Sequence, residues 1–230
     1  MKILLIAPEN HDLRTLPEIS SITISHNVRL LIERVTTRML FDLCASERYD
    51  VLHFAGHGGP DGILLSDNVL LSADEIATLS RMSGARVLFF NACSTGRLAA
   101  YSIRHGAAFV FFAVVDLEDD KAWSKPTAFY RNATDTSDAS LLAALAVADA
   151  GDSDYGYMVS PNLIIRYIDK IAEMQAQIDQ LSAQFEKMEK ETLALTIDKN
   201  RLMRSIMFYM VALSVVVVII YALSVFGGRQ

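Results

Sequence analysis

The stretch "DVLHFAGHGGPDG", residues 50–62, decides the fold, because an apolar run passes directly into a glycine turn that carries His57. The glycines exclude a stable helix at this point. We therefore predict a buried strand over 50–56, with His53 inside it as a hydrogen-bonded core histidine. A zinc site built from His53, His57 and Cys93 would need a helix here, so no metal is predicted.

The same layout recurs downstream, where the apolar run 87–90 passes into "NACSTG", residues 91–96. In an open parallel sheet, functional groups gather beyond the carboxyl ends of the strands. If the two strands are neighbours, His57 and Cys93 project into one cleft. A thiolate is a nucleophile, and an adjacent imidazole removes the thiol proton. The amides of Gly58 and Cys93 would then face a developing oxyanion.

The other apolar runs of residues 1–160 alternate with helical patterns. Continuous apolar strands separated by helices predict an α/β domain whose mostly parallel sheet is covered on both faces. Cys44 is predicted to lie in the core on a helix, and Ser72 and Glu75 form a predicted capping box after a hairpin. The expected strands cover 3–7, 28–35, 85–93 and 107–115, the expected helix containing Cys44 covers 36–49, and 116–125 is expected to be a charged loop.

Residues 161–204 carry a heptad pattern that begins after Ser160-Pro161, a helix start with proline at its first position. The pattern predicts a self-associating coiled coil roughly 60 Å long, and hence a homo-oligomer. A long helix folded back on the domain is the alternative. The a and d positions are Ile164, Tyr167, Ile171, Met174, Ile178, Leu181, Phe185, Met188, Thr192, Leu195, Lys199 and Leu202.

Residues 206–226 contain no charge, proline or glycine, and their number matches the roughly 30 Å hydrocarbon layer that a helix must cross. We predict a single-pass tail anchor in the inner membrane. Lys199, Arg201 and Arg204 precede this segment and only Arg229 follows it, which predicts a cytoplasmic catalytic domain. The two cysteines also favour a reducing compartment. The net charge of −6 argues against a nucleic-acid partner.

The segments "LHFAGHG", "FFNACSTG" and "GAAFVFF", followed by "AFYRN" and "ASLLAALAVA", resemble the CHAT family of caspase-like proteins in the expected order. The resemblance covers roughly residues 1–160. It implies a caspase-hemoglobinase fold and a cysteine endopeptidase that needs no cofactor. It matches His57 and Cys93 to the catalytic dyad and Gly58 to the oxyanion hole. It also matches Asp119 or Asp120 to an acidic position of the family. Many relatives carry large repeat domains, which this chain lacks, so regulation would fall to the coiled coil, the membrane or a separate sensor protein.

The sequence indicates less about which peptide substrate the predicted site would select. Asp116 follows an apolar strand, where an acidic side chain would favour a basic residue before the scissile bond, although a solvated loop is the simpler reading. Asn91 either orients the turn or lines the first pocket. Two functions remain open: a membrane-tethered endopeptidase in prokaryotic cell death or anti-phage defence, acting on a protein substrate, and a non-enzymatic scaffold whose transmembrane helices disrupt the bilayer.

Overall fold

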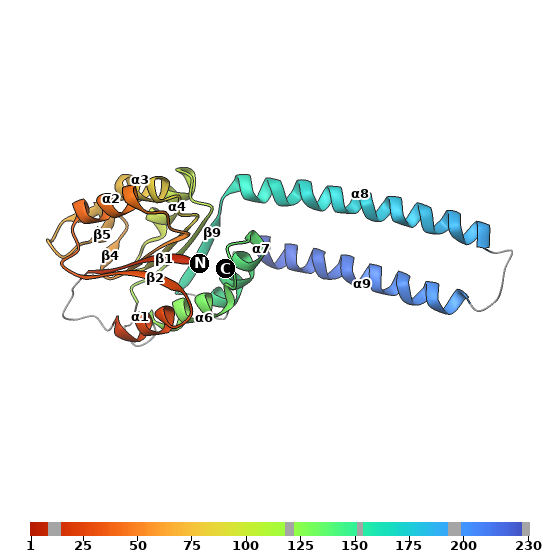
Figure 1. The fold of residues 1–230 in the computed structure, drawn as a ribbon, viewed down its shortest axis with the longest axis horizontal. Helices are drawn as coiled ribbons and strands as arrows, with labels where there is room; N and C mark the ends of the chain where they lie inside the picture. The colour runs from red at the N-terminus through yellow and green to blue at the C-terminus, as the bar shows by residue number, and fades with distance from the viewer. Residues whose placement is uncertain (9–14, 118–121, 151–153, 193–198, 227–230) are drawn as a thin grey trace. The chain divides into compact units, whose positions relative to one another are not determined.

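A computed structural model describes residues 1–8, 15–117, 122–150, 154–192 and 199–226. The chain divides into two units at Ser160 and Pro161, and each unit is treated separately. The first unit is an α/β sandwich in which one sheet is covered by helices on both sides (Figure 1). The predicted mostly parallel α/β fold is confirmed.

The central sheet has six strands in the order β2-β1-β3-β7-β8-β9. All neighbouring pairs are parallel except β8 and β9, which are antiparallel. Strand β9 was not predicted from the sequence. The strands are β1 (Lys2–Pro8), β2 (Asn27–Glu33), β3 (Val51–Ala55), β7 (Val87–Asn91), β8 (Phe109–Ala113) and β9 (Tyr155–Val159).

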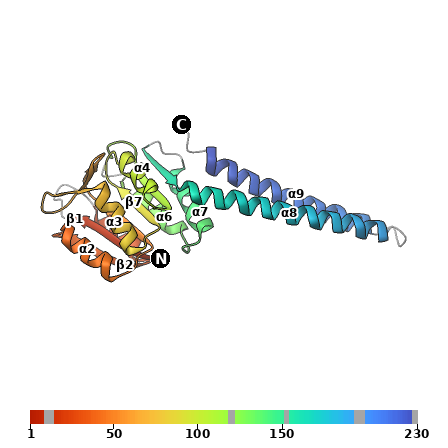
Figure 2. The same cartoon turned by 90° about the horizontal axis from the view of Figure 1, so that it is seen from above.

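Helices cover both faces of this sheet, as the two perpendicular views show (Figure 2). One face packs against α2 (Thr37–Ser46), α3 (Ala73–Ser83) and α4 (Gly96–Arg104). The other carries α1 (Leu16–Thr23), α6 (Ser124–Asn132) and α7 (Asp138–Asp149). Because both faces are buried, the strands need continuous apolar runs rather than alternation, as observed in β3 and β7.

A small second sheet joins β3 to α3. It consists of β4 (Gly58–Gly59), β5 (Gly62–Leu64) and β6 (Leu70–Ser72), paired antiparallel. The predicted capping box is confirmed: the Ser72 hydroxyl accepts from the Glu75 amide, and the Glu75 carboxylate accepts from the Ser72 amide. This box fixes the start of α3, the helix that returns the chain to β7.

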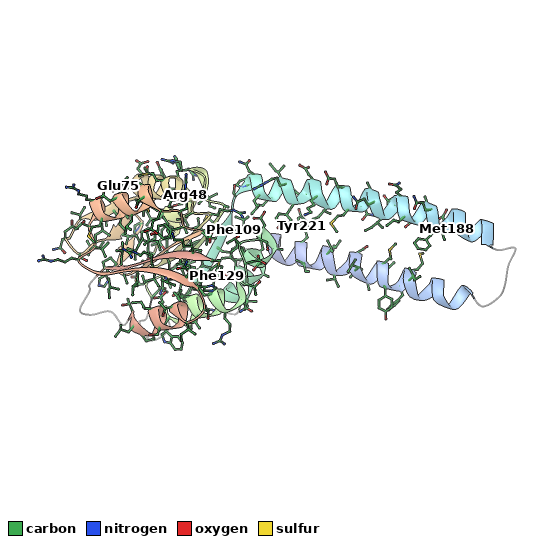
Figure 3. The ribbon with its side chains drawn as sticks, viewed as in Figure 1. Arg48, Glu75, Phe109, Phe129, Met188 and Tyr221 are labelled. Atoms are coloured by element: carbon green, nitrogen blue, oxygen red, sulfur yellow. The ribbon has the colours of Figure 1, made fainter. Side chains whose placement is uncertain are left out.

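Aromatic rings form a row across the sheet face that α6 covers. The His53 ring stacks on Phe89 at 4.6 Å between centroids, and Phe89 stacks on Phe111 at 4.5 Å. Phe129 of α6, labelled in Figure 3, packs against Phe89 at 5.4 Å. His53 is fully buried and hydrogen-bonded to Tyr130, which confirms the prediction of a core histidine.

The second unit contains two long helices, α8 (Pro161–Thr192) and α9 (Lys199–Phe226). The predicted helix start at Pro161 is confirmed. The predicted coiled coil stays a prediction, and its residues 193–198 lie outside the described residues. Helix α9 begins at Lys199, so the last predicted heptad belongs to the helix that carries the apolar segment. No proline or glycine lies between this last heptad and the apolar segment, which explains why α9 is continuous.

The predicted membrane span at 206–226 lies within α9. Within the parts of the chain that the structure describes, no helix has the length and apolar character needed to cross a membrane.

Candidate functional site

The strand ends that carry His57 and Cys93 are direct neighbours. Strands β3 and β7 pair in parallel with Ala55 opposite Asn91. His57 and Cys93 each lie two positions beyond that pair, at the same edge of the sheet. The Gly56 amide also donates to the Asn91 carbonyl at 3.2 Å, so the backbones remain joined past the last paired residues. The two predicted catalytic residues therefore leave adjacent strands at the same level.

Glycine is required at position 58 because the histidine turn packs tightly on the cysteine turn. A Cβ atom on Gly58 would lie 2.8 Å from the Ala92 Cβ and 2.9 Å from the Ile63 Cδ1, both closer than real Cβ contacts. Gly59 has no such restriction, since nothing lies within 4 Å of a Cβ added there. Gly58 thus brings the backbone next to His57 against the residue before Cys93.

A cavity of about 130 Å³ lies at this edge of the sheet. Its size is comparable to cavities that accept a benzene ring in other proteins. It is lined by Thr15, Glu18, Gly56, His57, Asn91, Ala92, Cys93, Leu117, Ala122 and Trp123. The cavity therefore brings together both predicted catalytic residues and Asn91.

Cys93 is half-buried and lies on a strained turn. The following residue, Ser94, has a φ of +51°, a conformation that non-glycine residues seldom adopt. The segment after β8 holds this turn, because the Ser94 amide donates to the Val115 carbonyl at 3.1 Å. The Leu117 amide donates to the Cys93 Sγ at 3.3 Å. The sulfur thus has a backbone donor that stabilises negative charge on it.

Asp116 is exposed on the loop after β8, as the simpler interpretation of a solvated loop predicts. Its carboxylate accepts a hydrogen bond from the Ser94 hydroxyl at 2.9 Å, and it is not among the residues that line the cavity. Asp116 therefore supports the turn beside Cys93. The alternative acidic candidates, Asp119 and Asp120, lie outside the described residues.

Asn91 is almost fully buried, and both ends of its amide are engaged. Its Nδ2 donates to the Glu18 carboxylate at 2.8 Å, and its Oδ1 accepts from the Tyr155 hydroxyl at 2.8 Å. Asn91 lines the cavity and ties β7 to α1 and β9, and its two predicted roles stay predictions.

Sequence reasoning missed Glu18 and Trp123, which both line the cavity. Pro17 and Glu18 are typical of the first turn of a helix, but nothing in that pattern indicates that the carboxylate is buried. Glu18 Oε1 lies 2.7 Å from His53 Nε2. Its second partner, Asn91, is 73 residues away along the chain. Only the tertiary fold brings these groups together.

The two cysteines differ sharply in environment. Cys44 is buried on α2 with 1% of its surface exposed, as predicted. Burial raises its pKa to about 11, so it stays a protonated thiol at neutral pH. Cys93 instead lines the cavity beside His57. Among the described residues, no three His, Cys, Asp or Glu side chains come together as a metal site.

An α/β domain with a thiol and an imidazole at adjacent strand ends is the arrangement expected of a caspase-like protein. The CHAT domain family matches residues 9–148, more than half of the chain, and the chain belongs to this family. The family is caspase-like and related to peptidases. A comparison with curated proteins gave no match.

Proposed function

We propose that this chain is a cysteine endopeptidase that uses His57 and Cys93 as a catalytic dyad. The observation that carries the proposal is the pairing of Ala55 with Asn91, which supports delivery of both side chains to one cavity. Membership of a caspase-like family supports the same chemistry. Neither a metal nor a cofactor enters the reaction.

The proposed reaction has two steps. His57 takes the Cys93 thiol proton, and the sulfur attacks the scissile carbonyl carbon to form a carbon–sulfur bond. His57 then gives that proton to the leaving amine as the carbon–nitrogen bond breaks, which leaves an acyl-enzyme. In the second step, water loses a proton to His57 and attacks the acyl carbon. The carbon–sulfur bond breaks, and the proton returns to the sulfur as the acid product leaves.

Backbone groups around the cavity would stabilise the charges that develop. We assign the oxyanion to the amides of Gly58 and Cys93, because glycine at 58 leaves that backbone accessible. The Leu117 amide, 3.3 Å from the Cys93 Sγ, favours the attacking thiolate. Asn91 and Asp116 hold the turn that carries the nucleophile.

The second unit supplies attachment and assembly in this proposal. Apolar side chains at the a and d positions Met174, Leu181 and Met188 of α8 are exposed, which supports pairing with other copies. The uncharged stretch 206–226 supports attachment to the inner membrane with the peptidase domain in the cytoplasm. Clustering of copies, or a separate sensor protein, would then switch on cleavage of nearby protein substrates in cell death or anti-phage defence.

The test is covalent labelling and cleavage by the full-length chain. Wild-type protein should react with peptidyl acyloxymethyl ketones at Cys93 and cleave members of a fluorogenic peptide library. Cys93→Ala and His57→Ala should lower cleavage by at least about 1,000-fold, as loss of a nucleophile or base does in other peptidases. Cys44→Ala is the matched control and should keep both activities. Cleavage that survives Cys93→Ala would refute the dyad.

A second candidate function is a non-enzymatic effector that perturbs the bilayer. The exposed apolar side chains of α9, among them Phe208, Val211 and Leu213, favour it. If the chain is a peptidase, the Cys93→Ala variant should lose the effect that the wild-type chain has on the cells that express it. This variant should keep its membrane location. If the Cys93→Ala chain stays fully active and only deletion of 206–226 silences it, the bilayer function is correct.

A further inference from the structure

We infer that the cavity beside Cys93 accepts the cationic side chain of a lysine or arginine residue, and that Glu18 is the residue that selects it. The inference names the substrate class of the proposed peptidase and therefore rests on that function. It replaces Asp116 with Glu18 as the acidic determinant, because Asp116 is engaged by Ser94 and does not line the cavity.

Glu18 is a buried carboxylate at the cavity, with only 2% of its surface exposed. Oε2 accepts from Asn91 Nδ2 at 2.8 Å, and Oε1 lies 2.7 Å from His53 Nε2. Burying a carboxylate is costly unless its charge is balanced or well hydrogen-bonded. Packing alone does not explain a buried carboxylate at the wall of a cavity.

Within the described residues, Glu18 Oε1 is a buried oxygen that has no hydrogen-bond partner. His53 Nδ1 is hydrogen-bonded to the Tyr130 hydroxyl at 2.9 Å, and His53 Nε2 lies 2.7 Å from Glu18 Oε1 without the geometry of a hydrogen bond. Burial, and then the charge of Glu18, raise the pKa of Tyr130 well above its ordinary value, so this hydroxyl keeps its proton to donate. Among the described side chains, Asn91 donates the hydrogen bond that Glu18 accepts, through its other oxygen.

No lysine or arginine within the described residues is paired with Glu18, whose ion-pair contact is with His53. A bound cation would therefore gain an ion pair in a site of low dielectric constant, where such pairs are stronger than in water.

The other walls of the cavity suit a long cationic side chain. Leu117 and Ala122 offer apolar contact for an alkyl stem. Trp123 is 41% exposed and lines the same cavity, and an indole face attracts ammonium and guanidinium groups. Because His57 and Cys93 line the cavity too, the side chain that it holds belongs to the residue beside the scissile bond.

The first experiment compares arginine with citrulline, its uncharged isostere, at the residue before the reactive carbonyl of acyloxymethyl ketone probes. Wild-type chain should label at Cys93 about 10- to 100-fold faster with arginine, the range for a hydrogen-bonded charge. Glu18→Gln should reduce this ratio to below about 3-fold, and Trp123→Leu should reduce it partially. Glu47→Gln is the control, because Glu47 pairs with Lys2 at the opposite edge of the sheet.

The second experiment needs no catalysis. n-Butylguanidinium, but not uncharged n-butylurea, should slow alkylation of Cys93 by iodoacetamide, measured by peptide mass spectrometry. Cys44, buried in the same chain, is the internal reference. Protection should disappear in Glu18→Gln, and thermal unfolding of each variant shows whether it is folded.

The two experiments separate the inference from the function on which it rests. Charge-selective protection without any probe labelling would refute the peptidase and keep the cation site. Labelling without charge preference, together with no protection, would refute the cation site and keep the peptidase.

Discussion

The two units of this chain differ in how far their large apolar side chains are buried. In residues 1–160 the large apolar groups of β3, β7 and β8 are buried between the sheet and its helices. In α8 and α9 many of them are exposed, for example Leu181 and Phe208. A buried core stabilises a fold by itself, whereas an exposed apolar helix needs another surface to cover it. The first unit therefore holds the candidate site, and the exposed apolar side chains of the second are consistent with the proposed association.

The strongest test of this contrast is a truncation in each unit. Phe89→Ala removes a fully buried ring that stacks on His53 and Phe111, so the free energy of unfolding should fall by about 3–5 kcal/mol. Leu181→Ala on α8 should change it by less than about 0.5 kcal/mol. Trp123, the sole tryptophan, reports urea unfolding of the first unit by fluorescence. Equal losses in the two variants would contradict the contrast.

The buried thiol gives a pH-dependent test. The pKa of Cys44 rises from 9.0 to about 11 on folding because burial disfavours the thiolate. The folded state therefore holds this proton more tightly, and its contribution is complete below pH 9 and is lost as pH rises toward 11. The free energy of unfolding should fall by up to about 2–3 kcal/mol across that window. Cys44→Ala should lack this part of the fall, while Cys93→Ala retains it.

The glycine turn tests how closely the two strand ends must approach. Gly58→Ala forces a Cβ to 2.8 Å from Ala92 and should cost about 1–3 kcal/mol and displace His57 from Cys93. Labelling of Cys93 by the acyloxymethyl ketone probes should therefore also decrease in this variant. Gly59→Ala, whose Cβ meets nothing within 4 Å, is the matched control and should leave both labelling and unfolding unchanged. Normal labelling in Gly58→Ala would show that the contact is not needed.

The smallest effect on unfolding is expected on α8. Leu181→Lys places a charge at a predicted d position and should weaken self-association by at least about tenfold, since charge at such a position destabilises the helix pair. Unfolding of the first unit should change by less than about 0.5 kcal/mol. Gln180→Lys, outside the a and d positions, is the control. Sedimentation in detergent measures the association, and identical behaviour of both variants would argue against the coiled coil.

Local sequence patterns predicted much of the first unit. The strands containing His53 and Phe89 are continuous apolar runs, and the capping box at Ser72 marks the start of α3. Strand β9 was missed because Tyr155–Val159 is short, contains a glycine and follows a long helical region. Within the six-stranded sheet of the described residues, β9 is also the strand that pairs antiparallel, added beside β8, where pairing depends on the fold as a whole.

Sequence by itself determined strands such as β3 and β7, the glycine turn and the choice of His57 and Cys93 as candidate residues, because each depends on neighbours within a few residues. The tertiary structure decided which strand lies beside which, and therefore that these two residues share a cavity. It also decided the role of Glu18, which reaches His53 and Asn91 only after α1 packs on the sheet. A carboxylate carries no local sign of burial, since burial is set by contacts between segments distant along the chain.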